Sequence, residues 1–240
     1  MRILIIRHAD PDYSIDSLTE KGWREAELLA NKLSQEKIDY VYCSPLGRAK
    51  DTCLTTLKRM GKEGEMVIKD WLREFSYPTV APTGKACHIP WDMLPSEWEH
   101  DERAYGRQWQ TAYGEESMYA RYLEAVAGLD ELICQHGYKR QGNGYVATKA
   151  NRDTIALFCH FGVECVLLSR LCNISPVLLW HHTVALPSSV TTLYTEEREA
   201  GRAIFRMSGF GDTGHLYAGG EAPSFAARYC ETYDCKEERH

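Results

Sequence analysis

The feature that most constrains the fold is a pair of short apolar runs, one at the start of the sequence and one about two thirds of the way along it. Residues 3–6 read Ile-Leu-Ile-Ile, and residues 154–159 read Thr-Ile-Ala-Leu-Phe-Cys. A continuous apolar run of this length is typical of a strand that is buried on both faces. Such strands occur mainly in parallel sheets that are covered by helices. The two runs therefore predict a sheet with helices packed against it.

The segments that follow each run alternate between helix and strand. A helix is expected to begin near Ser17 or Thr19, because either side chain can cap it and the next apolar residues recur at helical spacing (Trp23, Ala26, Leu29, Ala30 and Leu33). The later segments predict further strands and helices (strands 38–43, 188–194 and 203–207; helices 46–60, 115–134 and 162–172). This order predicts an α/β fold, a three-layer α/β/α sandwich around a mostly parallel sheet.

Residues 75–114 interrupt this order. The segment contains four prolines and three tryptophans (Pro78, Pro82, Pro90, Pro95, Trp91, Trp98 and Trp109), so we expect an irregular, aromatic-rich insertion. Its rings could form a small satellite core, or they could recognise the apolar or ring-bearing part of a substrate. We expect one domain over residues 1–229, with the insertion as a substrate cap, followed by a polar and mobile tail over residues 230–240.

Composition limits the partners and the compartment. The chain has 28 Lys and Arg against 34 Asp and Glu, a net charge of −6, so we expect no nucleic-acid partner held through phosphate contacts. No stretch approaches the ~18 apolar residues of a membrane span, and the N-terminal apolar run is too short for a signal peptide. The nine cysteines are scattered and odd in number, so we expect reduced core thiols and a cytoplasmic protein.

Basic and imidazole side chains stand where three of the predicted strands end. Arg7 and His8 follow the first strand, Arg48 follows the turn after the second, and His160 follows the strand over residues 154–159. In α/β sheets, ligands bind at the carboxyl ends of parallel strands, so these side chains are expected to converge. Two guanidiniums offer forked donors to a tetrahedral oxyanion, and two imidazoles offer a nucleophile and a further donor. The pattern predicts a site for a phosphoryl group.

These residues lie in motifs that resemble the histidine phosphatase superfamily, the phosphoglycerate-mutase-like enzymes. The motifs follow one another along nearly the whole chain outside the insertion: Arg7-His8-x-Asp10, Leu18-Thr19-x-x-Gly22, Ser44-Pro45-Leu46-Gly47-Arg48, Leu72-x-Glu74, His160-x-Gly162 and Gly211-Asp212-Thr213-Gly214-His215.

The resemblance implies a role for each matching residue. His8 would be the nucleophile that becomes phosphohistidine, and Arg7, Arg48 and His160 would bind the phosphoryl oxygens. Glu74 would be the proton donor, although Asp10 or Asp12 could also reach the leaving group. Phe161 replaces a common Gly but keeps the backbone N–H that would contact phosphate. The resemblance implies neither a cofactor nor a metal. His181-His182 and the pair Cys230 and Cys235 have no further ligand at the usual spacing.

Three functions fit these residues. The first is a phosphatase that acts on a small phosphomonoester. The second is a phosphomutase of the phosphoglycerate type, although the segment over residues 75–114 does not resemble the insertion of those enzymes. The third is a catalytically silent relative that binds a phosphorylated ligand. The complete set of core residues favours the phosphatase, while the natural substrate and the oligomeric state stay open at this point.

Overall fold

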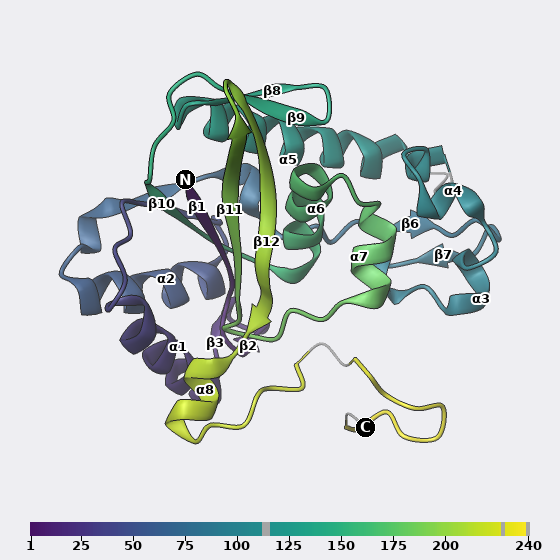
Figure 1. Cartoon of the computed structure of the whole chain (residues 1–240). Coiled ribbons are helices and arrows are strands. Elements are labelled where there is room, and N and C mark those ends of the chain that lie inside the picture. Colours follow the sequence, from purple (N-terminus) through teal and green to yellow (C-terminus); the bar gives the residue numbers. More distant parts are fainter. Residues whose placement is uncertain (112–115, 227–228, 239–240) are drawn as a thin grey trace.

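The computed structural model describes residues 1–111, 116–226 and 229–238, and its centre is an eight-stranded sheet (Figure 1). Four neighbouring strands are parallel: β5 (Met66–Ile68), β4 (Tyr40–Cys43), β10 (Thr154–Cys159) and β1 (Arg2–Arg7). The other four pair antiparallel in the order β11 (Val190–Glu199), β12 (Arg202–Asp212), β9 (Gly144–Ala147) and β8 (Tyr138–Gln141). The predicted α/β class is confirmed, and its parallel half contains both apolar runs.

Helices cover both faces of the sheet because successive strand residues point to opposite sides. Ile3 and Ile5 pack in one core with residues of α5 (Glu116–Gln135) and α6 (Phe161–Cys172). Leu4 and Ile6 pack in another core with residues of α1 (Glu20–Leu33) and α2 (Gly47–Met60). The sheet is therefore the middle layer of the predicted three-layer sandwich.

The helix ends follow the sequence signals closely. The Thr19 hydroxyl accepts a hydrogen bond from the Gly22 N–H and caps α1, and Gly61 ends α2 in the left-handed conformation. The expected apolar face of α1 is wrong at one position, because Trp23 is 43% exposed. The predicted first residue of α5, residue 115, lies outside the described residues.

The insertion consists of short elements packed onto helix α7 (Pro176–His182). They are β6 (Thr79–Val80), β7 (Ala86–Cys87), η3 (Pro90–Asp92), α3 (Pro95–Trp98), α4 (Glu102–Tyr105) and η4 (Trp109–Thr111), and residues 112–114 lie outside the described part. Trp98 and Trp109 are buried in the same core as Ile3 and Ile5. These rings therefore extend the main core instead of forming a satellite.

Several short elements complete the fold. They are β2 (Pro11–Asp12), β3 (Ser17–Leu18), η1 (Glu63–Glu65), η2 (Asp70–Leu72) and α8 (Gly214–Gly219). Within the described ranges, no helix has the length and apolar character that a membrane crossing requires. All nine cysteines are free thiols, but Cys134 and Cys230 are exposed, so the expectation of core thiols is wrong for these two.

Candidate active site

The two predicted histidines lie side by side at the carboxyl edge of the parallel strands. Arg7 pairs with Cys159 in the register of β1 and β10, which makes the next residues, His8 and His160, neighbours. Their ring centroids are 5.0 Å apart and the rings are tilted by 58°. Both side chains are almost completely buried. The strand register alone therefore brings together two residues that are about 150 positions apart in the sequence.

His8 has one ring nitrogen fixed and the other directed at an arginine. Its Nδ1 lies 2.7 Å from the Ala9 carbonyl oxygen, which can only accept a hydrogen bond, so Nδ1 carries the proton. Nε2 accepts a contact from the Arg48 Nε at 3.4 Å. Burial, followed by the charges of Arg7 and Arg48, holds the pKa of His8 well below its usual value. The imidazole is therefore neutral near pH 7, with its lone pair on Nε2.

Each of the two arginines also forms a hydrogen bond with a residue other than the histidines. The Arg7 NH1 donates to the Ala185 carbonyl oxygen over 2.6 Å. Arg48 donates to the Asp16 carboxylate over 2.5 Å, and the other Asp16 oxygen accepts the Gly47 N–H. A side chain on Gly47 would collide with the Asp16 backbone, so the glycine permits this contact. Asp16 thus fixes both the start of α2 and the direction of the Arg48 side chain.

His160 is held by the residue that follows the neighbouring strand β4. Its Nε2 lies 2.7 Å from the Ser44 Oγ, which also accepts the Leu46 N–H. Its Nδ1 is buried and has no hydrogen-bond partner among the described residues. Burial, and then the neighbouring His8 and arginines, lower the pKa of His160 well below its usual value. Phe161 begins α6, so its N–H has no acceptor within the helix.

Glu74 approaches this group from the loop after η2. One carboxylate oxygen accepts the backbone N–H groups of Phe75, at 2.7 Å, and Val163, at 3.1 Å. Burial raises the pKa of Glu74, although these two N–H groups and both arginines oppose the shift. Glu74 lines the same cavity as Arg7 and Arg48, whereas Asp10 and Asp12 are not among the lining residues.

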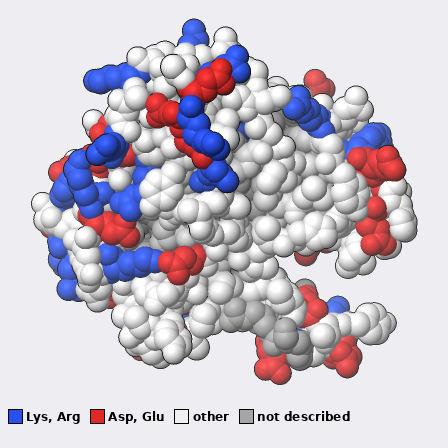
Figure 2. Space-filling model, in the orientation of Figure 1, with Lys and Arg blue, Asp and Glu red and all other residues white. Residues whose placement is uncertain are grey.

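The cavity above the arginines has a volume of about 880 Å³. Its walls are mostly aromatic and apolar and come from the insertion, α7 and the C-terminal segment; they include Tyr13, Ile89, Trp91, Met93, Phe161, Trp180 and Tyr229. Figure 2 shows a hollow between the main body and the C-terminal segment, where acidic side chains gather on that segment and few charges face it from above. Of the predicted site residues, Arg7, Arg48, Glu74 and Phe161 line the cavity, whereas His8 and His160 are buried and are not among the lining residues.

Sequence reasoning gave no role to two residues of this site, Ser44 and Asp16. Ser44 stood within a quoted motif, and its place after a strand was the signal that could have identified it. Trp91, one of the insertion's rings, packs edge-on against Phe161 at 5.7 Å and lines the cavity, and recognition of a substrate by these rings stays a prediction. Asp16 had no sequence signal, because its contact with Arg48 depends on how the loop between β2 and β3 folds back.

His215, the last residue of the final quoted motif, forms a hydrogen bond with Ser188. It is buried and is not among the residues that line the cavity.

Fold and geometry together define a class of protein. It is an α/β protein in which two histidines and two arginines lie together at the carboxyl edge of parallel strands. Among the described residues, no three His, Cys, Asp or Glu side chains gather as the ligands of a metal ion would. Over residues 3–204 the chain matches the histidine phosphatase superfamily (branch 1), and it belongs to that family. The predicted resemblance is confirmed.

Similar proteins include two from Hydrogenobacter thermophilus. Phosphoserine phosphatase 1 is 34% identical over 79 residues, and a second relative is 35% identical over 85 residues. These matches cover 29% and 32% of this chain but only 36% and 41% of the relatives, so the chain matches well under two thirds of either one.

Solved structures extend the similarity to the fold. A mycobacterial glucosyl-3-phosphoglycerate phosphatase has a TM-score of 0.57 and 18% identity, covering 88% of this chain and 98% of that one. A phosphoserine phosphatase mutant from Entamoeba histolytica, in complex with phosphoserine, has a TM-score of 0.53 and 17% identity, covering 90% and 98%. At these identities the likeness shows the fold alone.

Proposed function

We propose that this protein is a phosphatase that hydrolyses a small phosphomonoester through a phosphohistidine on His8. The observation that carries the proposal is the state of His8: a neutral imidazole with its proton on Nδ1 and its Nε2 lone pair beside the Arg48 guanidinium. A nucleophile for phosphorus needs this free lone pair and a cationic surrounding for the phosphoryl oxygens. The family membership and the phosphatases among its relatives support the same reaction.

In the first step, His8 Nε2 attacks phosphorus and the bond between phosphorus and the ester oxygen breaks. Arg7 and Arg48 balance the charge on the phosphoryl oxygens as it spreads in the transition state. If the Ser44 hydroxyl donates to His160 Nε2, the proton of His160 stays on Nδ1, which is otherwise unpartnered among the described residues, and it becomes a further donor to phosphate. The Phe161 N–H at the start of α6 adds another donor.

Glu74 completes both steps as proton donor and then as base. Its raised pKa keeps the carboxyl protonated to a higher pH than a solvated glutamate, so it can protonate the departing ester oxygen. The resulting carboxylate then takes a proton from the water that attacks the phosphohistidine, and the bond between nitrogen and phosphorus breaks to release inorganic phosphate. This sequence of steps uses no metal ion.

The charges around the cavity favour a substrate whose only strong negative charge is its phosphate. Among the described residues that line the cavity, the positively charged Lys and Arg side chains are two arginines, Arg7 and Arg48. Both lie at the end of the cavity nearest the histidines. Asp92 and Glu231 line the outer part, and burial lowers the pKa of the lining residue His181 to about 4, so it adds no charge near neutral pH. Among the described residues of that outer part, a second phosphate or carboxylate on the substrate would find no lysine or arginine side chain.

The test is hydrolysis of p-nitrophenyl phosphate by the purified protein without added metal. His8→Ala should reduce the rate by at least about 1,000-fold, because no other group supplies the nucleophile. His100→Ala is the matched control, because His100 is exposed on the insertion, and it should keep the full rate. Trapping of acid-labile phosphate on the wild-type chain, but not on His8→Ala, would identify the intermediate. Unchanged turnover by His8→Ala would refute the nucleophile.

A further inference from the structure

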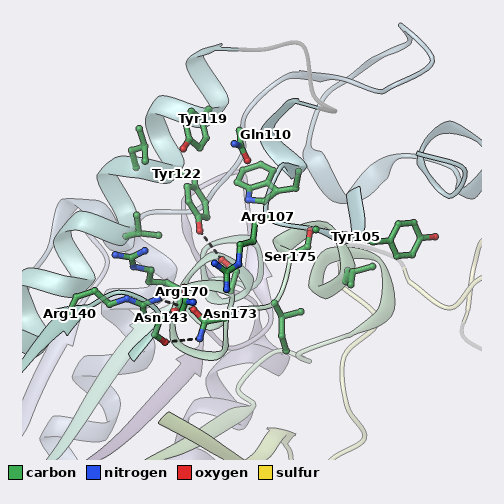
Figure 3. A pocket seen from close by; sticks show the side chains of 17 residues that line it. Tyr105, Arg107, Gln110, Tyr119, Tyr122, Arg140, Asn143, Arg170, Asn173 and Ser175 are labelled. Carbon is green, nitrogen blue, oxygen red and sulfur yellow. Dashed lines mark hydrogen bonds between the residues drawn. The ribbon is translucent and has the colours of Figure 1, made fainter. Parts of the chain in front are cut away.

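We propose that a second cavity, which we call the arginine cavity, binds a small organic anion that carries a flat ring (Figure 3). The arginine cavity has a volume of about 630 Å³, within the range of small-molecule sites. It lies between the insertion, α5, the ends of α6 and α7, and the turn between β8 and β9. None of its lining residues also lines the active-site cavity.

Three guanidiniums make this cavity attractive to an anion. Arg107, Arg140 and Arg170 line it, and none of the described lining residues is Asp or Glu. Arg170 is paired with Asp130, which lies outside the lining, over 2.5 Å. Arg107 forms no ion pair in the part of the chain that the structure describes, and Figure 3 shows it reaching from the insertion toward Arg170. Counted over the described residues, the lining therefore keeps an excess of two positive charges.

The arginines are also positioned in advance, which lowers the entropic cost of binding. Arg140 donates to the Asn173 side chain over 2.9 Å and to the Arg170 carbonyl oxygen over 3.0 Å, and its guanidinium lies 4.9 Å from the centre of the Tyr145 ring. These contacts leave one N–H free on each terminal nitrogen of Arg140. A carboxylate, sulfonate or phosphate group fits such fixed, forked donors.

The remaining wall suits a flat apolar group. Trp109 packs edge-on against Tyr122 at 4.8 Å, and Tyr122 stacks with Tyr119 at 6.0 Å with an angle of 11° between the rings. Leu123 and Ile174 line the same cavity and are 46% and 38% exposed, although large apolar side chains usually gain by burial. A ring that covers these side chains while its anionic group meets the arginines would use both halves of the cavity.

One contact between two rings links the arginine cavity to the active-site cavity. Trp109 lines the former and Trp180 lines the latter, and the two rings meet edge to face at 6.0 Å. The Trp180 Nε1 donates to the Gly162 carbonyl oxygen over 3.1 Å, two residues after His160. An occupant of the arginine cavity would therefore contact Trp109, whose ring packs against a residue that lines the active-site cavity.

The experiment measures binding of naphthalene-1-sulfonate to the full chain by isothermal titration calorimetry. This probe has a ring and an anionic group but no phosphate ester, so it cannot be hydrolysed. Arg107→Gln should weaken binding at least about tenfold, as expected for loss of a charge-assisted hydrogen bond. Arg198→Gln, which removes an exposed arginine on β11, should leave the affinity unchanged.

A second variant shows which cavity the probe occupies. Arg48→Gln alters the active site and should leave probe affinity unchanged, whereas Arg107→Gln should leave hydrolysis of p-nitrophenyl phosphate unchanged. The proposal is overturned if the wild-type chain does not bind the probe, if Arg107→Gln binds as tightly as Arg198→Gln, or if Arg48→Gln is the variant that weakens binding. None of these outcomes depends on whether the protein is a phosphatase.

Discussion

At the scale of single residues, burial under two arginines has opposite effects on two kinds of side chain. His8 loses its positive charge, because both burial and the arginines disfavour the protonated ring. Glu74 keeps its proton to a higher pH, because burial outweighs the attraction of the same arginines for its carboxylate. Both shifts favour the neutral form of the side chain, which is the form that the proposed nucleophile and the proposed acid need for ester cleavage.

Replacement of Glu74 tests its assignment as the acid. Glu74→Gln should lower kcat/KM for ethyl phosphate by about 100-fold or more, because an alkoxide leaves poorly without a proton. The same variant should lower the rate of the first step with p-nitrophenyl phosphate far less, because p-nitrophenolate leaves without one. In the wild type, the ethyl phosphate rate should fall as pH rises through the raised pKa of Glu74, and the Gln variant should lack this fall. Asp12→Asn is the control. A large loss in that variant instead would move the role to Asp12.

The residues that carry chemistry could be found from the sequence because they directly follow buried strands. Arg7, His8 and His160 needed only the strand ends and the rule that parallel strands share an edge. Glu74 came from the family resemblance, since no local pattern marks it. Asp16 could not be found, because a half-exposed carboxylate in a loop acquires meaning only when Gly47 and Arg48 are folded against it.

At the scale of elements, the start of α6 depends on the absence of a side chain at Gly162. A Cβ there would lie 2.1 Å from the Trp91 ring and 2.8 Å from the Glu74 carboxylate. Gly162→Ala should therefore displace both, destabilise the fold by about 1–3 kcal/mol as overpacking does, and lower kcat/KM at least about tenfold. Urea unfolding and steady-state kinetics measure the two effects.

Gly64→Ala is the matched control for that substitution. Gly64 has open space around its Cβ position and lies in η1, far along the chain from the site elements. It should leave stability and kinetics close to those of the wild type. If Gly162→Ala behaves in the same way, the close packing of Trp91 and Glu74 on α6 is not needed for activity.

The elements that the sequence predicts are those with a strong apolar pattern. β1, β10, α1, α2 and α6 agree with their expected ranges within a few residues. The hairpin of β8 and β9 was not predicted, because its strands have only four residues each and β8, at the edge of the sheet, is mostly polar. The sequence cue for this hairpin was the pair Gly142-Asn143, which favours a tight turn between two strands. In the structure Gly142 has φ 58°, a left-handed conformation that glycine adopts readily. The short elements of the insertion have no periodicity and are held by contacts with α7.

At the scale of the whole molecule, buried carboxyl groups should make stability depend on pH. Burial raises the pKa of Glu25 in α1 from 4.5 to about 7, so the folded state binds a proton that the unfolded state releases. The stabilisation is complete below about pH 4.5 and is lost as pH rises through about 7. By the usual conversion, this group alone changes the free energy of unfolding by about 3 kcal/mol over that window.

Urea unfolding at pH 5, 6.5 and 8 checks this dependence. Glu25→Gln should reduce the loss of stability between pH 5 and pH 8 by about 2–3 kcal/mol. Glu164, whose pKa burial also raises to about 7, should keep a similar dependence in that variant. Glu27→Gln, on the exposed side of the same helix, should reproduce the wild-type profile. If the stability of Glu25→Gln falls between pH 5 and pH 8 as much as that of the wild type, Glu25 is not a source of the pH dependence.

The position of β1 in the sheet has a consequence for biosynthesis. The first strand of the chain lies between β10 and β11, so its ladder partners begin at Thr154 and end at Tyr194. During translation at roughly 5–20 residues per second, His8 leaves the ribosome on the order of 10 s before His160 does. Until then, an aliphatic strand has no neighbours on either side. The nascent chain thus carries an exposed aliphatic segment that chaperones would recognise, and His8 and His160 can meet only after about 150 further residues have been translated.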